Sequence, residues 1–130
     1  MLAVDTNVLV RVLVDDPDAS RQCAAARKLV AGAGSVYVPQ VVQAETVWVL
    51  ERSYDVSRPA IASALACVAD NAAFVLQRPE AFRGALTEYR EGRADFSDCL
   101  IVAECRVEGV KLATFDRKLR KHAGTVLITA

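Results

Sequence analysis

Short apolar runs alternate with longer helical patterns along this chain, and no other feature constrains its fold as much. We expect strands at residues 2–4, 35–38, 73–76, 110–115 and 125–128. We expect helices at residues 7–14, 19–31, 40–54, 59–70, 79–91, 95–108 and 116–122. Such alternation is typical of a mostly parallel sheet with helices on both faces. With 130 residues, the chain is predicted to form a single α/β domain spanning 1–130.

The composition bounds the function classes only weakly. Hydrophobic residues make up 53% of the chain, which is high for a single domain and indicates either deeply buried elements or an apolar surface that a partner covers. The 16 basic and 16 acidic residues cancel. Global charge therefore does not point to nucleic acid, although local clusters of basic residues remain compatible with it.

Four cysteines and one histidine make a zinc site improbable, because no C-x-x-C pair is present. We expect the cysteines to be small, buried and reduced side chains. Asp5 interrupts the apolar N-terminus, which does not fit a signal peptide. No apolar run approaches the roughly 20 residues of a membrane span, so we expect a cytoplasmic protein.

Acidic residues follow two of the predicted strands. Asp5 comes directly after the first strand, and Asp116 follows the strand that ends at Phe115. In open parallel sheets, functional sites form beyond the carboxyl ends of the strands. We therefore expect both carboxylates at the same edge of the sheet.

Two further acids lie in predicted helices. Glu45 has Val41, Val42, Trp48 and Val49 at helical spacings, and Asp98 has Ile101, Val102 and Cys105. An acid with apolar neighbours on its own face either reaches solvent at the edge of that face or serves a site. The presence of Asp5 and Asp116 in the same chain favours a role in a functional site for Glu45 and Asp98. Asp95, one turn before Asp98, fits a helix cap and a ligand equally well.

A cluster of these acids requires a cation. Two carboxylates about 5 Å apart repel by roughly 3 kcal/mol at an effective dielectric of 20, and six such pairs exceed the stability of a typical domain. Oxygen ligands without histidine select Mg²⁺ or Mn²⁺. The chemistry that follows is metal-assisted hydrolysis. Thr6, Asn7 and Thr114 are candidates for supporting hydrogen bonds, although Thr6 and Asn7 also fit helix capping.

Basic residues lie next to two of these acids. Arg93 precedes Asp95, and Arg117 and Lys118 follow Asp116. They are candidate contacts for RNA phosphates; the alternative is a solvated helix face. Binding that weakens with salt would distinguish the two.

The motifs resemble those of the PIN domain, and specifically those of VapC toxins from type II toxin–antitoxin systems. The resemblance rests on Asp5-Thr6-Asn7 after a strand, Glu45 in the third helix, the run from Asp95 to Ala103 that includes Asp98, and Thr114-Phe115-Asp116. It implies a three-layer α/β/α fold and a Mg²⁺- or Mn²⁺-dependent endoribonuclease. It also implies Asp5, Glu45, Asp98 and Asp116 as the catalytic and metal-binding acids, a homodimer, and inhibition by a VapB-like antitoxin.

Two other classes of protein are weaker alternatives. An aspartate-dependent phosphatase would have a second acid where this chain has Asn7. A non-catalytic or RNA-binding module on the same scaffold would not require the acids. Histidine-based nucleases and Ser–His–Asp hydrolases are disfavoured, because His122 is the only histidine. No phosphate-binding glycine loop of the Walker or G-x-G-x-x-G type is present.

Overall fold

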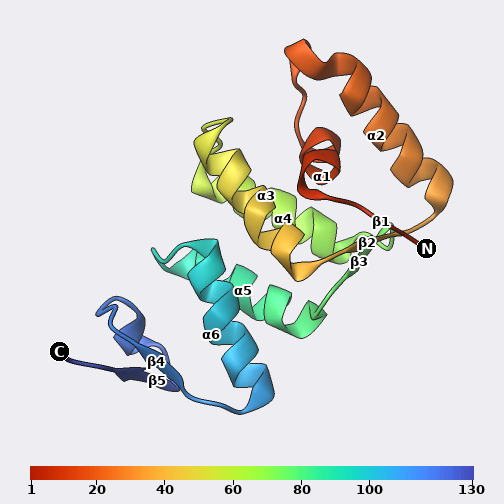
Figure 1. Cartoon of the computed structure of the whole chain (residues 1–130). Helices are drawn as coiled ribbons and strands as arrows, with labels where there is room; N and C mark the ends of the chain where they lie inside the picture. The colour runs from red at the N-terminus through yellow and green to blue at the C-terminus, as the bar shows by residue number, and fades with distance from the viewer. The chain divides into compact units, whose positions relative to one another are not determined.

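The computed structural model describes all 130 residues, as two compact units. We call Met1–Arg78 the N-terminal unit and Pro79–Ala130 the C-terminal unit. Each combines helices with parallel strands (Figure 1). The predicted α/β class and the parallel pairing are confirmed. The strands divide into two sheets, one in each unit.

The N-terminal unit is built on a three-stranded parallel sheet in the order β1-β2-β3. Leu2 pairs with Val36, and Val36 pairs in turn with Phe74. The elements, in chain order, are β1 (Leu2–Ala3), α1 (Thr6–Leu13), the 3₁₀ turn η1 (Pro17–Ala19), α2 (Ser20–Ala33), β2 (Val36–Val38), α3 (Gln40–Arg52), α4 (Arg58–Asp70) and β3 (Phe74–Leu76). β1 and β2 are thus neighbours although α1 and α2 separate them in the chain.

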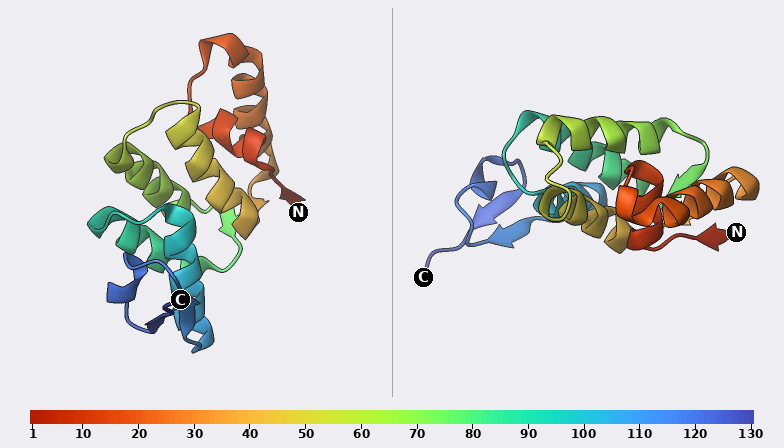
Figure 2. Two further views of the ribbon diagram at one scale, coloured as in Figure 1. Left: turned by 60° about the vertical axis from the view of Figure 1, so that its left-hand side comes forward. Right: turned by 90° about the horizontal axis from the view of Figure 1, so that it is seen from above.

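The C-terminal unit contains two helices and a two-stranded parallel sheet, β4-β5. Its elements are α5 (Pro79–Glu91), α6 (Phe96–Glu108), β4 (Leu112–Thr114), the 3₁₀ turn η2 (Leu119–Lys121) and β5 (Thr125–Leu127). Helices α5 and α6 lie side by side in every view (Figures 1 and 2). Phe96 of α6 makes edge-on ring contacts with Phe82 and Tyr89 of α5, at centroid distances of 5.8 and 5.6 Å. Gly84 admits Ala103 so closely that an added Cβ would lie 3.4 Å from the alanine methyl group.

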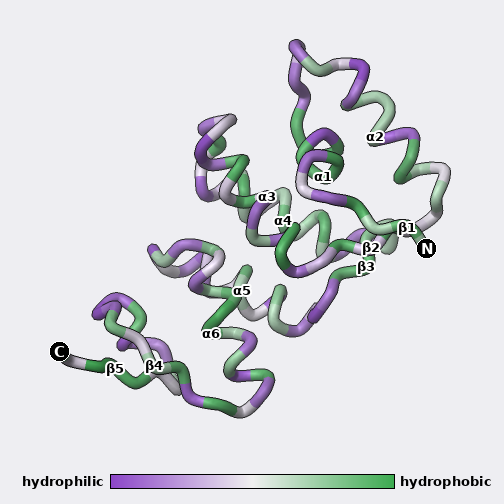
Figure 3. Tube along the Cα trace, in the orientation of Figure 1, coloured by the Kyte–Doolittle hydropathy of each residue, from purple (hydrophilic) through white to green (hydrophobic).

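The helix faces follow the expected alternation in part. The trace of each helix changes between polar and apolar residues along its length (Figure 3). The predicted apolar face of α5 is buried as expected: Phe82, Ala85, Leu86 and Tyr89. The predicted face of α3 is wrong, since Val41 is 70% exposed and Trp48 57% exposed. Val42, Val47 and Leu50 are buried together with the polar residues Gln43 and Thr46. The pattern misled because α3 carries apolar residues on both sides.

Some smaller expectations also need correction. Leu29, an apolar residue of the helix expected at 19–31, is 41% exposed. Of the four cysteines, all unpaired, only Cys23 and Cys99 are buried, whereas Cys67 is exposed. The helix expected at 116–122 is the short 3₁₀ turn η2. No helix has both the length and the apolar character needed to cross a membrane.

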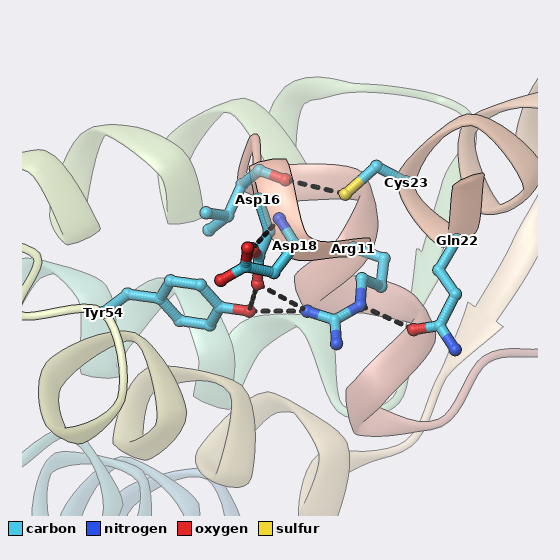
Figure 4. A network of polar contacts seen from close by, with 7 residues as sticks. Arg11, Asp16, Asp18, Gln22, Cys23 and Tyr54 are labelled. Atoms are coloured by element: carbon cyan, nitrogen blue, oxygen red, sulfur yellow. Dashed lines mark hydrogen bonds and ion pairs between the residues drawn. The ribbon is translucent and has the colours of Figure 1, made fainter. Parts of the chain in front are cut away.

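A polar network joins α1 to the loops around it (Figure 4). The Arg11 guanidinium of α1 donates to the Tyr54 hydroxyl and to Gln22, and it pairs with Asp16 at 3.4 Å. The Tyr54 hydroxyl donates to the Asp16 carboxylate at 2.7 Å. This hydrogen bond is the main reason that the pKa of Asp16 lies below its ordinary value, with further contributions from the Asp18 backbone N–H and from Arg11. The network ties η1 and the end of α3 to α1.

Candidate active site

Asp5 lies between β1 and α1, immediately before the first residue of α1. Val4 continues the hydrogen bonding between β1 and β2 by one residue, because its backbone N–H donates to the Tyr37 carbonyl at 3.0 Å. Asp5 then adopts an extended backbone as the N-cap of α1, and its Oδ1 accepts a hydrogen bond from the Val8 N–H at 3.0 Å. A carboxylate at this position satisfies a helix donor and lies at the positive end of the helix dipole. The cap is thus Asp5 itself, so the capping role considered for Thr6 and Asn7 is wrong.

Thr6 connects this strand end to α3. Its hydroxyl donates to Glu45 Oε1 at 3.0 Å, a contact between residues 39 positions apart in the chain. The supporting hydrogen bond expected of Thr6 is therefore present. Asn7 is exposed and makes no such bond; it lines a hollow of about 290 Å³ between α1 and α2.

The start of α3 is fixed to the carboxyl ends of two strands. The buried Gln43 side chain donates to the carbonyls of Val38 and Gln77, at 3.2 and 2.9 Å. The Gln77 side chain in turn accepts from the Gln40 N–H at 2.8 Å. With its buried face held in this way, α3 presents Glu45 on its exposed side. In the N-terminal unit, Glu45 is thus hydrogen-bonded to Thr6, the residue that follows Asp5 in the chain.

Two aspartates of the C-terminal unit, Asp95 and Asp116, act electrostatically on a third, Asp98. Asp98 lies in the first turn of α6 and is half-buried. Burial raises the pKa of the Asp98 carboxyl above its ordinary value, and the negative charges of Asp95 and Asp116 raise it further. The helix N-terminus acts in the opposite direction, because its dipole favours the carboxylate. Desolvation and repulsion outweigh it, which identifies an acid that lacks a compensating positive charge.

Asp116 is positioned by a tight turn after β4. Its backbone N–H donates to the Thr114 hydroxyl at 3.0 Å, and its own Oδ1 accepts from the Lys118 N–H at 2.8 Å. Thr114 therefore supports Asp116 through its backbone and not through its carboxylate. One oxygen of the Asp116 side chain remains available for a ligand.

Asp95 occupies the N-cap position of α6, but its side chain makes no capping hydrogen bond. Two roles were considered for Asp95, a helix cap and a ligand. It occupies the cap position but does not make the hydrogen bond of a cap. Its carboxylate instead acts on Asp98 through its charge.

The acids divide between the units, and the structure describes each group by itself. Asp5 and Glu45 belong to the N-terminal unit, and Asp95, Asp98 and Asp116 to the C-terminal unit. Nowhere do three or more His, Cys, Asp or Glu side chains gather in the arrangement of a metal site. The four-carboxylate site therefore stays a prediction. The chemistry of the C-terminal group does fit a cation, because oxygen donors that repel one another are stabilised by a hard divalent ion.

A basic pocket of about 590 Å³ lies within the C-terminal unit. Its lining includes the predicted phosphate contacts Arg93 and Lys118, whereas Arg117 is exposed outside it. The other lining residues come from α5, α6, the loop between them and the turn around η2: Glu88, Glu91, Gly92, Ala94, Arg106, Lys121 and His122. Glu88 pairs with Arg106 and with His122, at 3.3 Å in each case.

The sequence reasoning missed the part played by Glu88, Arg106 and His122 in this pocket. Their spacing carries no local signal, since the contacts join separate elements. His122 follows η2, yet its ring is held against α5. Only the basic residues next to two of the acids, Arg93 before Asp95 and the cluster at positions 117 to 121 after Asp116, pointed to this region.

Comparison with protein families adds one finding. A family model described as PIN domain matches residues 2–125. No curated protein and no solved structure matches the chain.

Proposed function

We propose, because this chain belongs to the PIN domain family, that it is a divalent-metal-dependent endoribonuclease. PIN domains are generally nucleases, and they usually use divalent metals. The observation that carries the proposal for this chain is the raised pKa of Asp98 beside Asp95 and Asp116. Perturbed acids of this kind are concentrated at functional sites, where charge is held against its own repulsion.

The residues proposed to hold the ion are Asp5, Glu45, Asp98 and Asp116, and Asp95 is a further candidate ligand. A bound Mg²⁺ or Mn²⁺ supplies a water molecule of lowered pKa and stabilises the charge that develops on the phosphate. The protein's contribution is to fix the carboxylates in advance. This positioning matters because the rate of the catalysed reaction falls quickly when the metal ligands are misplaced.

In three of these carboxylates, one of the two oxygens accepts a hydrogen bond that holds the group in place. Asp5 accepts from the Val8 N–H, Glu45 from the Thr6 hydroxyl, and Asp116 from the Lys118 N–H. In each of the three the second oxygen is left for an ion or a water molecule. Burial and the negative charges of Asp95 and Asp116 destabilise the ionised form of Asp98, so this carboxylate would gain most from a bound cation.

A more specific form of the proposal is a VapC-like toxin. It would act on cellular RNA in the cytoplasm, assemble as a homodimer, and be neutralised by a VapB-like antitoxin. Exposed apolar side chains support partners of this kind. Val41 and Trp48 of α3 are 70% and 57% exposed, and such residues are enriched where proteins associate.

The test has an in vitro arm and a cellular arm. Purified protein should cleave single-stranded RNA with Mg²⁺ or Mn²⁺ and not with EDTA. Its induction should arrest growth and produce new RNA 5′ ends that sequencing identifies. Asp5→Asn should abolish all three effects. Asparagine still caps α1 through its side-chain oxygen, so the variant should keep its fold, as far-UV circular dichroism would show.

A metal titration separates the enzyme from a non-catalytic module on the same scaffold. Thermal unfolding of the metal-free protein should shift upwards with Mg²⁺ or Mn²⁺, because a ligand at 100 times its Kd stabilises by about 2.7 kcal/mol. No shift with either ion, together with no cleavage, would refute the enzyme.

A further inference from the structure

We infer that the basic pocket of the C-terminal unit binds a backbone phosphate of the RNA strand next to the bond that is cleaved. The inference rests on the proposed function and adds to it a binding site for the nucleotide that flanks the reaction. The pocket is defined by the nine lining residues given above.

The charges in the pocket favour an anion. Four permanent cations line it against two carboxylates, an excess of two positive charges with His122 neutral. Glu88 is already paired with Arg106 and with His122. Arg93, Lys118 and Lys121 are exposed and in no ion pair, so they remain for a ligand. A guanidinium beside two ammonium groups is a common set for phosphate.

The size of the pocket suits a nucleotide. Its volume of about 590 Å³ falls within the roughly 300–1,000 Å³ of small-ligand sites. Gly92 and Ala94 contribute no bulk to the wall.

The pocket and the aspartate cluster share two loops. Arg93 precedes Asp95 by two residues, and Lys118 follows Asp116 by two. The Lys118 N–H also donates to Asp116 Oδ1. Asp95 and Asp116 both act electrostatically on Asp98. Each loop thus delivers one acid to the cluster and one cation to the pocket, so a phosphate in the pocket belongs to a strand that runs past the acids.

The lining also indicates how the nucleotide is recognised. The lining contains no Phe, Tyr or Trp, and the ring of its single histidine, His122, is held against Glu88 at 3.3 Å, whereas proteins that read unpaired bases usually stack them on aromatic rings. The pocket is therefore a contact to the sugar–phosphate backbone that does not discriminate between bases.

The experiment measures binding without cleavage. The full chain is kept in EDTA, and fluorescence anisotropy follows a short labelled single-stranded RNA at several salt concentrations. The test variant is Lys118→Ala/Lys121→Ala, which keeps the backbone N–H that holds Asp116. The matched control is Arg21→Ala/Lys28→Ala, which removes two exposed cations from α2. Thermal unfolding confirms that both variants are folded.

We expect the pocket variant to bind RNA about 10-fold more weakly than the control. Its dependence of log Kd on log salt should be shallower by about 0.7, the change for one lost phosphate on a single strand. Lys118→Arg/Lys121→Arg should restore binding. The weakening should be equal for oligo-uridine and oligo-adenosine.

Three outcomes would overturn the inference: equal binding by the pocket variant and the control, a loss that differs between the two homopolymers, or no RNA binding by the wild-type chain. Equal binding would assign the pocket to an acidic protein segment instead. Cleavage with Mg²⁺ is measured separately. If the wild-type chain cleaves RNA and the pocket variant binds RNA as tightly as the control, the pocket inference alone is refuted. If the chain binds RNA through the pocket but does not cleave it, the proposed nuclease activity alone is refuted.

Discussion

Asp16 and Asp98 lie in different units, and their carboxyl groups respond to their surroundings in opposite ways. The pKa of Asp16 is lowered by the Tyr54 hydroxyl, the Asp18 N–H and Arg11. The pKa of Asp98 is raised by burial and by Asp95 and Asp116. Donors surround the first acid, whereas the second has acids as its charged neighbours.

We interpret this difference as that between an acid that supports the fold and an acid of the proposed site. The Asp16 network is complete within the protein, because each of its main groups has a partner (Figure 4). The charged neighbours of Asp98 are acids, and under the proposed function a cation would compensate their repulsion. Structural ion pairs and functional acids look alike in sequence, and the sign of the pKa shift together with the identity of the neighbours distinguishes them.

The largest expected effect is that of Asp98→Asn. Cleavage should be abolished, a loss greater than the roughly 100-fold that removal of a hydrogen-bonding partner of a metal ligand can cost, because Asp98 is itself proposed as a ligand. The metal-free variant should also melt a few degrees higher than the wild type, since the repulsion from Asp95 and Asp116 is gone. A gel-based cleavage assay and thermal unfolding in EDTA measure the two effects.

The control for that variant is Asp18→Asn, the same change of charge at an exposed position. It should leave cleavage unchanged and stability within about 0.5 kcal/mol. An Asp98→Asn protein that cleaves at the wild-type rate would remove Asp98 from the site.

Thr6→Val should produce an intermediate effect on activity. The substitution deletes the donor to Glu45 Oε1 and leaves a side chain of similar shape. The bond is exposed, so stability should change by less than about 0.5 kcal/mol. The rate of cleavage should fall about 10-fold, because Glu45 is no longer held.

Thr6→Ser keeps the hydroxyl and should restore most of that rate. If Thr6→Val were as active as the wild type, Glu45 would not depend on Thr6 for its position. Glu45→Gln, which can still accept the bond, should abolish cleavage while keeping the fold.

Tyr54→Phe should have the smallest effect, confined to stability. It removes the main cause of the lowered Asp16 pKa. Because the pKa of the Asp16 carboxyl is lowered from its ordinary value of 3.8, its ionised form stabilises the fold at pH values above 3.8. This contribution is lost as the pH falls through the lowered pKa. The melting temperature of the variant should therefore lie below that of the wild type near neutral pH, and the two should converge in acid.

Cleavage by Tyr54→Phe at neutral pH should equal that of the wild type. A gap in melting temperature that stays constant from neutral to strongly acidic pH would show that Asp16 is not the group responsible.

Much of the fold could be predicted because its signals are local. The apolar run before Asp5 and the proline at position 79 mark element boundaries in the sequence itself, and α5 has the predicted bounds. The face of α3 could not be predicted. Val41 and Trp48 are as apolar as Val42 and Val47, yet only the second pair is buried, because Gln43 anchors its own side of the helix to the strand ends.

The sequence by itself determined the order of the elements, the parallel pairing and the acids that define the family motifs, since these depend on short-range periodicity and on residue chemistry. Only the tertiary structure decided that Thr6 holds Glu45, that Asp95 and Asp116 act on Asp98, and that Glu88 joins Arg106 and His122 beside a basic pocket. Each of these relations joins residues from different elements or loops. Hydrogen bonds and electrostatic interactions depend on distance in space, which chain packing sets and local sequence does not encode.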